Sequence, residues 1–170
     1  LIDSHPELRS AYDGAIGQTL LNRGEVVESK PFIINTLKRT QAESLMAYNK
    51  YAATSLLISE AQYKEALEQS EALQQTMLKD LSQGANSERA FSEVLFAFNL
   101  LRIAMLHQQL ENKNEELRSW QEWKAYAGLD KASKQSTGIS PLAFRAIIQQ
   151  LATGKIALPD YIAYREKVLQ

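Results

Sequence analysis

The feature that most constrains this chain is a pattern that occurs three times without repeating its letters. Each copy has a small residue among large aliphatic ones, then a short polar break, then a second amphipathic run. The first runs are residues 15–20, 52–57 and 101–106, and the second runs follow at 32–34, 63–67 and 117–123. Two helices joined by a tight turn, repeated along a chain, predict a stacked array of helical hairpins. Such arrays mostly bind other proteins, so the pattern also predicts a class of function.

Composition agrees with a folded, helical chain. Its 170 residues are enough for one domain with a hydrophobic core, and its 45% hydrophobic and 23% charged residues are close to globular averages. Seven Gly and four Pro provide little turn chemistry for a β-protein. Runs rich in Ala, Leu, Gln, Glu and Lys are those that helices prefer. We therefore expect an all-α fold in a single domain spanning residues 1–170.

The charge pattern argues against nucleic-acid and membrane partners. Net charge is −1, and no run of Lys and Arg is longer than Lys38-Arg39. The basic patch of a nucleic-acid binder is therefore missing, as is the polycationic patch that would attract an anionic membrane. The apolar region 91–110 contains Glu93, Arg102 and His107, and so falls short of a membrane-spanning helix. We expect no nucleic-acid partner and no direct membrane contact by this segment.

Two compositional features leave the compartment open. The chain has no cysteine, which excludes disulfides and thiolate metal sites without indicating a compartment. It begins at Leu1 and not at Met, so we expect that upstream sequence was removed. Localisation is accordingly cytoplasmic, or extracytoplasmic if a signal or anchor preceded Leu1.

Capping residues predict the helix boundaries. Ser4-x-x-Glu7, Thr40-x-x-Glu43 and Ser59-x-x-Gln62 have capping-box spacing, and Gly24 and Gly84 can end helices. Pro31 predicts that the second helix begins near Ser29. The expected helices are 4–22, 29–39, 40–58, 59–83, 87–110, 114–126, 140–153 and 159–170. Residues 6–126 then form three irregular hairpins, 127–139 form a loop, and 140–170 form a C-terminal capping hairpin.

The fifth of these helices is expected to organise the core. Thirteen of the 20 residues from Phe91 to Leu110 are apolar, and they surround the helix axis. A helix that is apolar on all sides is buried on more than one side.

At this point the residues resemble a tetratricopeptide-repeat array. That family has a small residue where the first helix of each repeat crosses the second, and another small residue in the first turn of the second helix. The first-helix pairs here are Gly17 with Leu20, Thr54 with Leu57, and Ala104 with His107, and the second-helix pairs are Ser29 with Ile33, Ala66 with Ser70, and Glu116 with Trp120. Glu116 departs from the pattern, and the spacings of 37 and 50 residues (17 to 54, 54 to 104) depart from about 34.

The resemblance implies a right-handed superhelix whose ligands lie along the first helices. Carried over residue by residue, the partner-binding surface is Gln18, Asn22, Tyr48, Tyr51, Ser55, Arg102, Gln108 and Gln109. The family's carboxylate clamp is mostly absent, because Phe98 and Gly14 replace its Lys residues and Gln18 and Ala52 replace its Asn residues. A receptor for a peptide's terminal carboxylate is therefore disfavoured.

A second candidate surface is an aromatic ledge. Trp120, Trp123 and Tyr126 are spaced three apart on one helix, and such side chains are frequent interface anchors. The alternative is that they pack against the C-terminal hairpin.

Catalytic chemistry has few candidates. His107 and Glu111 are four residues apart on one helix, but one imidazole with one or two carboxylates is a poor transition-metal site. We expect a non-enzymatic protein–protein interaction module or assembly subunit, without a cofactor, that binds a protein or peptide segment. The alternatives are a membrane-tethered extracytoplasmic module, a metal-dependent enzyme using His107 and Glu111, and a helical domain that forms homo-oligomers.

Overall fold

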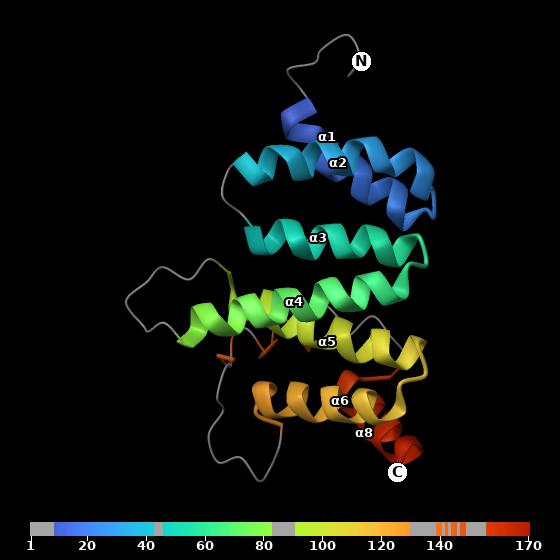
Figure 1. Ribbon diagram of the computed structural model, residues 1–170, viewed down its shortest axis with the longest axis vertical. Helices are drawn as coiled ribbons and strands as arrows, with labels where there is room; N and C mark the ends of the chain where they lie inside the picture. The colour runs from blue at the N-terminus through green and yellow to red at the C-terminus, as the bar shows by residue number, and fades with distance from the viewer. Residues whose placement is uncertain are drawn as a thin grey trace. The chain divides into compact units, whose positions relative to one another are not determined.

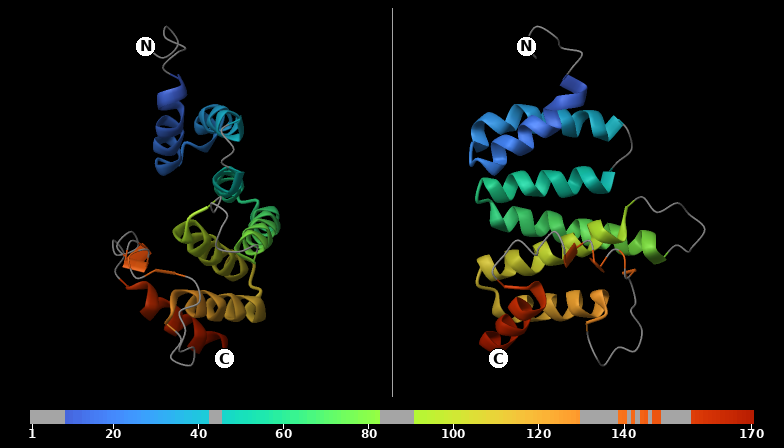
Figure 2. Two further views of the ribbon diagram at one scale, coloured as in Figure 1. Left: turned by 90° about the vertical axis from the view of Figure 1, so that its left-hand side faces the viewer. Right: turned by 180° about the vertical axis from the view of Figure 1, so that it is seen from behind.

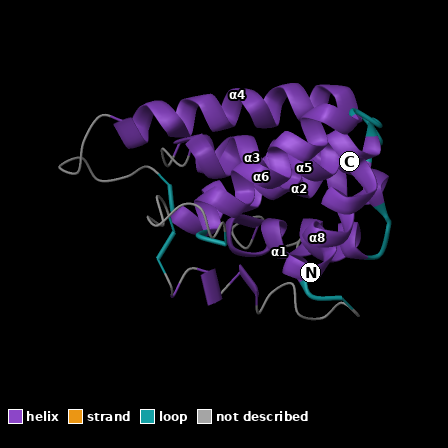
Figure 3. Ribbon diagram, turned by 90° about the horizontal axis from the view of Figure 1, so that it is seen from below, coloured by secondary structure: helices purple, strands orange, loops and turns teal. Residues whose placement is uncertain are grey.

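The computed structural model describes residues 9–42, 46–82, 91–129 and 156–170, with positions 139, 140, 142, 144, 145, 147 and 148. Every regular element in these ranges is a helix and none is a strand, which confirms the all-α prediction for them (Figure 3). The helices are α1 (Arg9–Asn22), α2 (Val26–Ala42), α3 (Met46–Ser59), α4 (Tyr63–Ser82), α5 (Glu93–Gln109), α6 (Lys113–Ala127) and α8 (Leu158–Leu169) (Figure 1). Within the described ranges, none of them combines the length and apolar character needed to cross a membrane.

The chain divides into two compact units, Leu1–Ala66 and Leu67–Gln170. The first unit contains α1, α2 and α3, and the second contains α5, α6 and α8. The boundary lies in the first turn of α4. The 170 residues predicted as a single domain thus contain two packed units.

In the first unit, α1 and α2 lie side by side and cross at a glycine (Figures 1 and 2). A Cβ atom on Gly17 would lie 2.7 Å from Cγ1 of Ile33 and 3.3 Å from its backbone nitrogen. A side chain at this position would force the two helices apart, so the crossing requires glycine. The resemblance to a tetratricopeptide-repeat array implied a small residue at this crossing.

Two ion pairs add to the packing of the first unit. Arg39 donates to Oδ2 of Asp13 over 3.1 Å, and the Asp13 side chain is completely buried. This bond joins the ends of α1 and α2 that lie away from their connecting turn. Lys30 of α2 pairs with Glu60, which follows α3. The pairs therefore link α2 to both of its neighbours along the chain.

One type of turn joins α1 to α2, α3 to α4, and α5 to α6. In each turn a residue with positive φ donates its N–H to the carbonyl three residues earlier, and the next residue donates to the carbonyl five residues earlier. These two bonds define a Schellman motif. The positive-φ residues are Gly24 (78°), Ala61 (58°) and Glu111 (59°), and the bonds are Gly24 to Leu21, Glu25 to Leu20, Ala61 to Ile58, Gln62 to Leu57, Glu111 to Gln108, and Asn112 to His107.

Before α5, three of the predicted boundaries were wrong. α2 begins at Val26 and contains Pro31, instead of beginning near Ser29. Val27 and Pro31 are both exposed, so water can reach the carbonyl that lacks its amide partner. Thr40 lies inside α2 and does not open a helix. Ser59 ends α3, and its hydroxyl donates back to the Ser55 carbonyl, so it does not cap α4.

In the second unit, α5 starts later than predicted. It begins at Glu93 and not after Asn86, because the N-cap is Ser92, whose hydroxyl accepts from the Leu95 N–H over 3.1 Å. Phe91, before the cap, packs on Phe96 with ring centroids 6.2 Å apart. These contacts form a hydrophobic staple, which fixes the direction in which the chain enters α5.

The core of the second unit surrounds α5. Leu95, Phe96, Ala97, Leu100, Leu101, Ile103, Ala104 and Leu106 are buried on it, as predicted for a central helix. The Asn99 side chain donates to the Ser70 carbonyl of α4 over 2.9 Å, and the Trp123 indole of α6 donates to the Ala97 carbonyl over 3.2 Å. Burial of α5 is incomplete, because Met105 is 57% exposed. The helix is therefore buried on more than one side, as predicted, and Met105 marks its exposed face.

The last helix, α8, packs against α6 in the same unit (Figure 2). Arg165 donates to both carboxylate oxygens of Glu116, from Nε over 2.7 Å and from a terminal nitrogen over 2.8 Å. The Glu116 side chain is 2% exposed, and it also accepts from the Trp120 indole over 3.1 Å. Lys124 pairs with Glu166 over 2.7 Å. A buried, bidentate ion pair therefore holds α8 on α6.

Several predicted features lie outside the described residues. They include Ser4 and Glu7 at the start of the chain, Gly84, and residues 130–138 of the predicted loop. The described part of that loop begins as expected, because α6 ends at Ala127 and Gly128 adopts φ 71° as its C-cap.

Candidate functional site

The second unit contains a polar pocket of about 560 Å³ between α4, α5 and α6. Four carboxylates line it, from Glu68 and Glu71 on α4 and from Glu115 and Glu122 on α6. The guanidinium of Arg118 and the imidazole of His107 are the other ionisable groups in its wall. Negative charge therefore predominates among the side chains of the pocket.

His107 connects the wall of the pocket to the core. Its side chain is 8% exposed, and its Nε2 lies 3.5 Å from Oε1 of Glu71. The side-chain amide of Asn112 lies 3.4 Å from its Nδ1. An amide NH₂ can only donate, so Nδ1 acts as the acceptor and Nε2–H faces the Glu71 carboxylate. This contact orients Glu71, whose side chain is 48% exposed at the pocket.

Glu122 faces the pocket from α6. Its Oε1 accepts from the side-chain amide of Gln74 over 2.6 Å. Burial raises the pKa of the Glu122 carboxyl above its ordinary value, whereas the nearby Arg118 charge and the Gln74 bond act in the opposite direction. Partial burial therefore outweighs the two stabilising contacts, and the charged form of Glu122 is less favoured than that of a carboxyl in water.

The hydroxyl and imidazole side chains at the pocket make contacts with other groups of the chain. The Ser119 hydroxyl donates to the Glu115 carbonyl of its own helix over 2.7 Å. His107 contacts Glu71, whereas Glu111 is exposed and occupies the positive-φ position of the α5–α6 turn. In the part of the chain that the structure describes, no group of three or more His, Asp or Glu residues could hold a metal ion.

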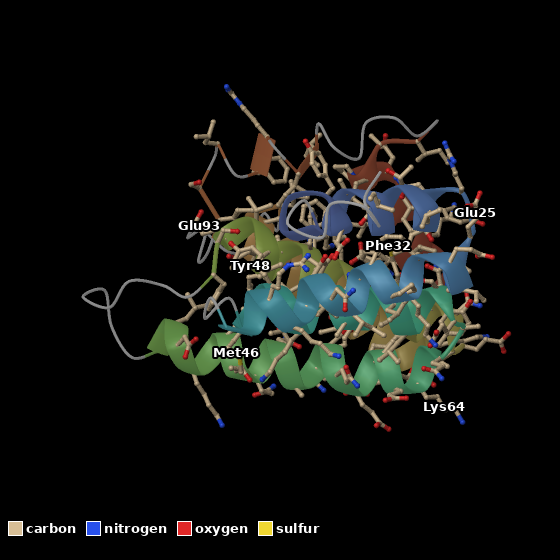
Figure 4. All side chains as sticks on the ribbon, turned by 90° about the horizontal axis from the view of Figure 1, so that it is seen from above. Glu25, Phe32, Met46, Tyr48, Lys64 and Glu93 are labelled. Carbon is tan, nitrogen blue, oxygen red and sulfur yellow. The ribbon has the colours of Figure 1, made fainter. Side chains whose placement is uncertain are left out.

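The predicted partner-binding residues fall in both units, and five of them are in the first. On α1, the Gln18 side chain donates to that of Asn22 over 2.9 Å, and both residues are exposed. On α3, Tyr48 is 40% exposed near the helix start (Figure 4), while Tyr51 and Ser55 are half-buried. The Ser55 hydroxyl donates to the Tyr51 carbonyl over 3.2 Å. Tyr48 is thus the most accessible aromatic of this predicted set.

The other three predicted residues are on α5 in the second unit. Arg102 is half-buried and Gln109 is exposed. Gln108 accepts a hydrogen bond from the Tyr161 hydroxyl of α8 over 2.7 Å, so the chain's own C-terminal helix already binds it. Sequence reasoning missed the exposed Met105, although its spacing from Arg102 and Gln109 places it on the same face of the helix.

The aromatic ledge is not accessible to a partner in this structure. Trp120 and Trp123 are both 0% exposed, and Tyr126 is half-buried with its ring centroid 4.8 Å from that of Phe96. Trp120 also packs edge-on against Tyr161 of α8, with centroids 6.0 Å apart. The two indoles belong to the core, because α5 and α8 cover the face on which they lie.

The pocket itself was not predicted from the sequence. His107 had been singled out, but its partner Glu71 is on a different helix, and Glu122 and Gln74 are on two helices as well. The charge content of each helix gave no sign that these side chains converge.

Comparisons with protein-family models, with curated proteins and with solved structures found no match for this chain.

Proposed function

We propose that this chain is a non-enzymatic protein–protein interaction module built on tetratricopeptide-repeat-like hairpins that stack in a right-handed superhelix. The observation that carries the proposal is the recurrence of one turn geometry at Gly24, Ala61 and Glu111. Each of these residues lies seven positions after a buried residue, and the three buried residues are Gly17, Thr54 and Ala104. The resemblance assigns these three to the first helix of each repeat. A common spacing and a common turn support three equivalent structural units.

The second helices support the same equivalence. Ser29, Ala66 and Glu116 are completely or almost completely buried. They lie twelve residues after Gly17, Thr54 and Ala104, respectively. Small buried residues allow close helix packing, and in the third case Arg165 neutralises the carboxylate. Arrays of this kind offer extended helical surfaces for binding other proteins.

The partner-binding surfaces in this proposal are the exposed sides of the first helices. In the first unit they comprise Gln18, Asn22, Tyr48, Tyr51 and Ser55, and in the second unit Arg102, Met105 and Gln109. Tyr48 and Met105 are 40% and 57% exposed, and tyrosine and methionine are frequent contact residues on binding surfaces. The polar composition of these surfaces favours association that depends weakly on salt.

The test is capture of a partner followed by reconstitution. The protein would be immobilised, partners captured from the native host identified by mass spectrometry, and the binding of each purified partner measured by calorimetry. Tyr48→Ala and Met105→Ser should each weaken binding about tenfold or more, which corresponds to about 1.4 kcal/mol. Tyr164→Ala is the matched control, because Tyr164 is 61% exposed on α8 and outside the proposed surfaces. If the folded Tyr48 and Met105 variants bind every purified partner like wild type, the first helices are not the binding surface.

A further inference from the structure

We infer that the polar pocket between α4, α5 and α6 receives a lysine or arginine side chain of a partner protein's basic segment. This inference rests on the proposed function and specifies the chemistry of the partner. It concerns side chains of the second unit alone and adds a surface that the sequence did not predict.

The balance of charge in the pocket favours a cation. Four carboxylates face one guanidinium, and that guanidinium, Arg118, lies 3.7 Å from Glu115 on the same helix. Arg118 also lowers the pKa of Glu122 through its charge, but one guanidinium cannot balance four carboxylates. A pocket lined mainly by one sign of charge raises the local concentration of ligands of the opposite sign.

Two of the carboxylates have a neighbour in the wall of the pocket. Gln74 of α4 holds Glu122 through a hydrogen bond of 2.6 Å, and the buried His107 lies 3.5 Å from Glu71. Each of these contacts engages one carboxylate oxygen, whereas an ionised carboxylate can accept about four hydrogen bonds. Acceptor capacity therefore remains on both groups, and prior orientation reduces the entropy lost on binding.

The partial burial of Glu122 agrees with a cationic occupant. Because burial raises the pKa of this carboxyl, its charged form is destabilised in the unoccupied protein. An ammonium or guanidinium group within hydrogen-bonding distance would offset that effect, since an opposite charge favours ionisation.

The apolar part of the wall suits the stem of such a side chain. Leu78, which is 38% exposed, Ala72 and the buried Ile103 line the same pocket as the carboxylates. Lysine and arginine place their methylene groups against apolar surface while their charged ends reach polar groups. The volume of about 560 Å³ is within the usual range of ligand sites, which is about 300–1,000 Å³.

The inference is tested by NMR titration of the full chain with two peptides. The probe is a blocked nonapeptide of Ser and Ala with a central Lys-Leu-Arg, and its twin carries Glu-Leu-Glu instead. We expect saturable amide shifts centred on His107, Ser119 and Glu122 with the basic peptide and none with the acidic one. Shifts spread evenly over the acidic surface, or equal shifts with both peptides, would overturn the inference.

Charge-matched variants separate a local site from general attraction. Glu71→Gln with Glu122→Gln removes two charges from the pocket and should weaken basic-peptide binding about tenfold. Glu25→Gln with Glu28→Gln removes two charges from exposed positions of the first unit and should change binding less than about twofold. Amide spectra and melting curves would establish that both variants are folded. Equal weakening by the two variants would contradict a pocket site.

The captured partner distinguishes failure of this inference from failure of the proposed function. If a purified partner loses affinity with Tyr48→Ala or Met105→Ser but binds the Glu71/Glu122 variant like wild type, the interaction module stands and the pocket inference is wrong. If the pocket variant alone loses affinity, the pocket is the contact and the first helices are not.

Discussion

The ion pair between α6 and α8 yields the sharpest prediction about stability. Arg165→Met removes the two guanidinium donors from Glu116 and leaves a carboxylate whose side chain is 2% exposed. Methionine keeps most of the aliphatic volume, so the change tests the charge and not the packing. We expect α8 to detach from α6 at much lower denaturant concentration than in the wild type.

The magnitude follows from what remains around Glu116. Breaking a buried pair by removing one partner costs about 3–5 kcal/mol. Two features lower that cost here, because Trp120 still donates to the carboxylate and the first turn of α6 favours a negative charge by about 0.3–1 kcal/mol. We therefore expect Arg165→Met to lower the free energy of unfolding of the second unit by about 3 kcal/mol. Glu116→Gln should cost about 1–2 kcal/mol, since Arg165 is 19% exposed and can turn toward water.

The assay is urea denaturation followed by tryptophan fluorescence. Both tryptophans of the chain, Trp120 and Trp123, are buried in the second unit and report on its unfolding. Circular dichroism of the same samples checks that the indole signal does not merely follow the loss of the bond to Glu116. Combining the two single variants with the double variant gives a coupling energy, which should exceed about 1 kcal/mol.

Hydrogen bonds to Glu116 raise the pKa of Arg165 above its ordinary value. A cationic group whose pKa is higher in the folded state than in the unfolded state stabilises the folded state fully at pH values below its unfolded-state pKa. This stabilisation is lost only as pH rises through the folded-state pKa. Arginine therefore contributes this stabilisation throughout the neutral range of the assay. The matched control is Arg118→Met, because Arg118 is 80% exposed and its pair with Glu115 should contribute less than about 1 kcal/mol. If Arg165→Met is as mild as Arg118→Met, the ion pair does not hold α8 in place.

Three further predictions concern single side chains. Gly17→Ala should destabilise the first unit by about 1–3 kcal/mol in thermal melts, because the new Cβ would overlap Ile33. The control is Gly14→Ala, whose Cβ would lie 3.4 Å from Thr36, and it should be neutral or stabilising by up to about 1 kcal/mol. Equal effects of the two substitutions would show that the helices do not cross at Gly17. Gly24→Ala should lower the free energy of unfolding by about 1 kcal/mol, and Ala61→Gly should raise it by a similar amount, since only glycine adopts positive φ without strain. If both substitutions change the free energy of unfolding in the same direction, the turn assignment is wrong. The raised pKa of Glu122 means that the folded state holds this proton more tightly than the unfolded state. The free energy of unfolding should therefore fall as pH rises through the window just above the ordinary carboxyl pKa. Glu122→Gln should remove this dependence, and an unchanged pH profile of the variant in chemical denaturation would refute the prediction.

The sequence predicted features that depend on neighbouring residues. The helical periodicity, the small residue at the Gly17 crossing and the break at Gly24 are local signals, and the structure has each of them. The boundary at Pro31 was missed because the buried Ser29 and the contact of Ile33 with α1 hold α2 in place despite the proline. Tertiary packing here outweighs the local preference.

The candidate site was largely beyond sequence reasoning. A spacing of three residues placed Trp120 and Trp123 on one face, but it could not show that other helices cover this face. His107 stood out as one of two histidines, yet its contact with Glu71 depends on how α4 and α5 pack. Local signals identify faces of helices, whereas a pocket depends on which faces meet.

The most informative departure from the repeated pattern is Glu116. In the sequence pattern it stands twelve residues after Ala104, as Ser29 stands after Gly17 and Ala66 after Thr54, and both of those residues are small and buried. A buried carboxylate there is stable only with a counter-charge, and α8 supplies it through Arg165. In the sequence, Glu116 weakened the resemblance to a regular array. In the structure, its ion pair with Arg165 joins α8 to α6, so the position that departs from the sequence pattern is the one that binds the C-terminal helix.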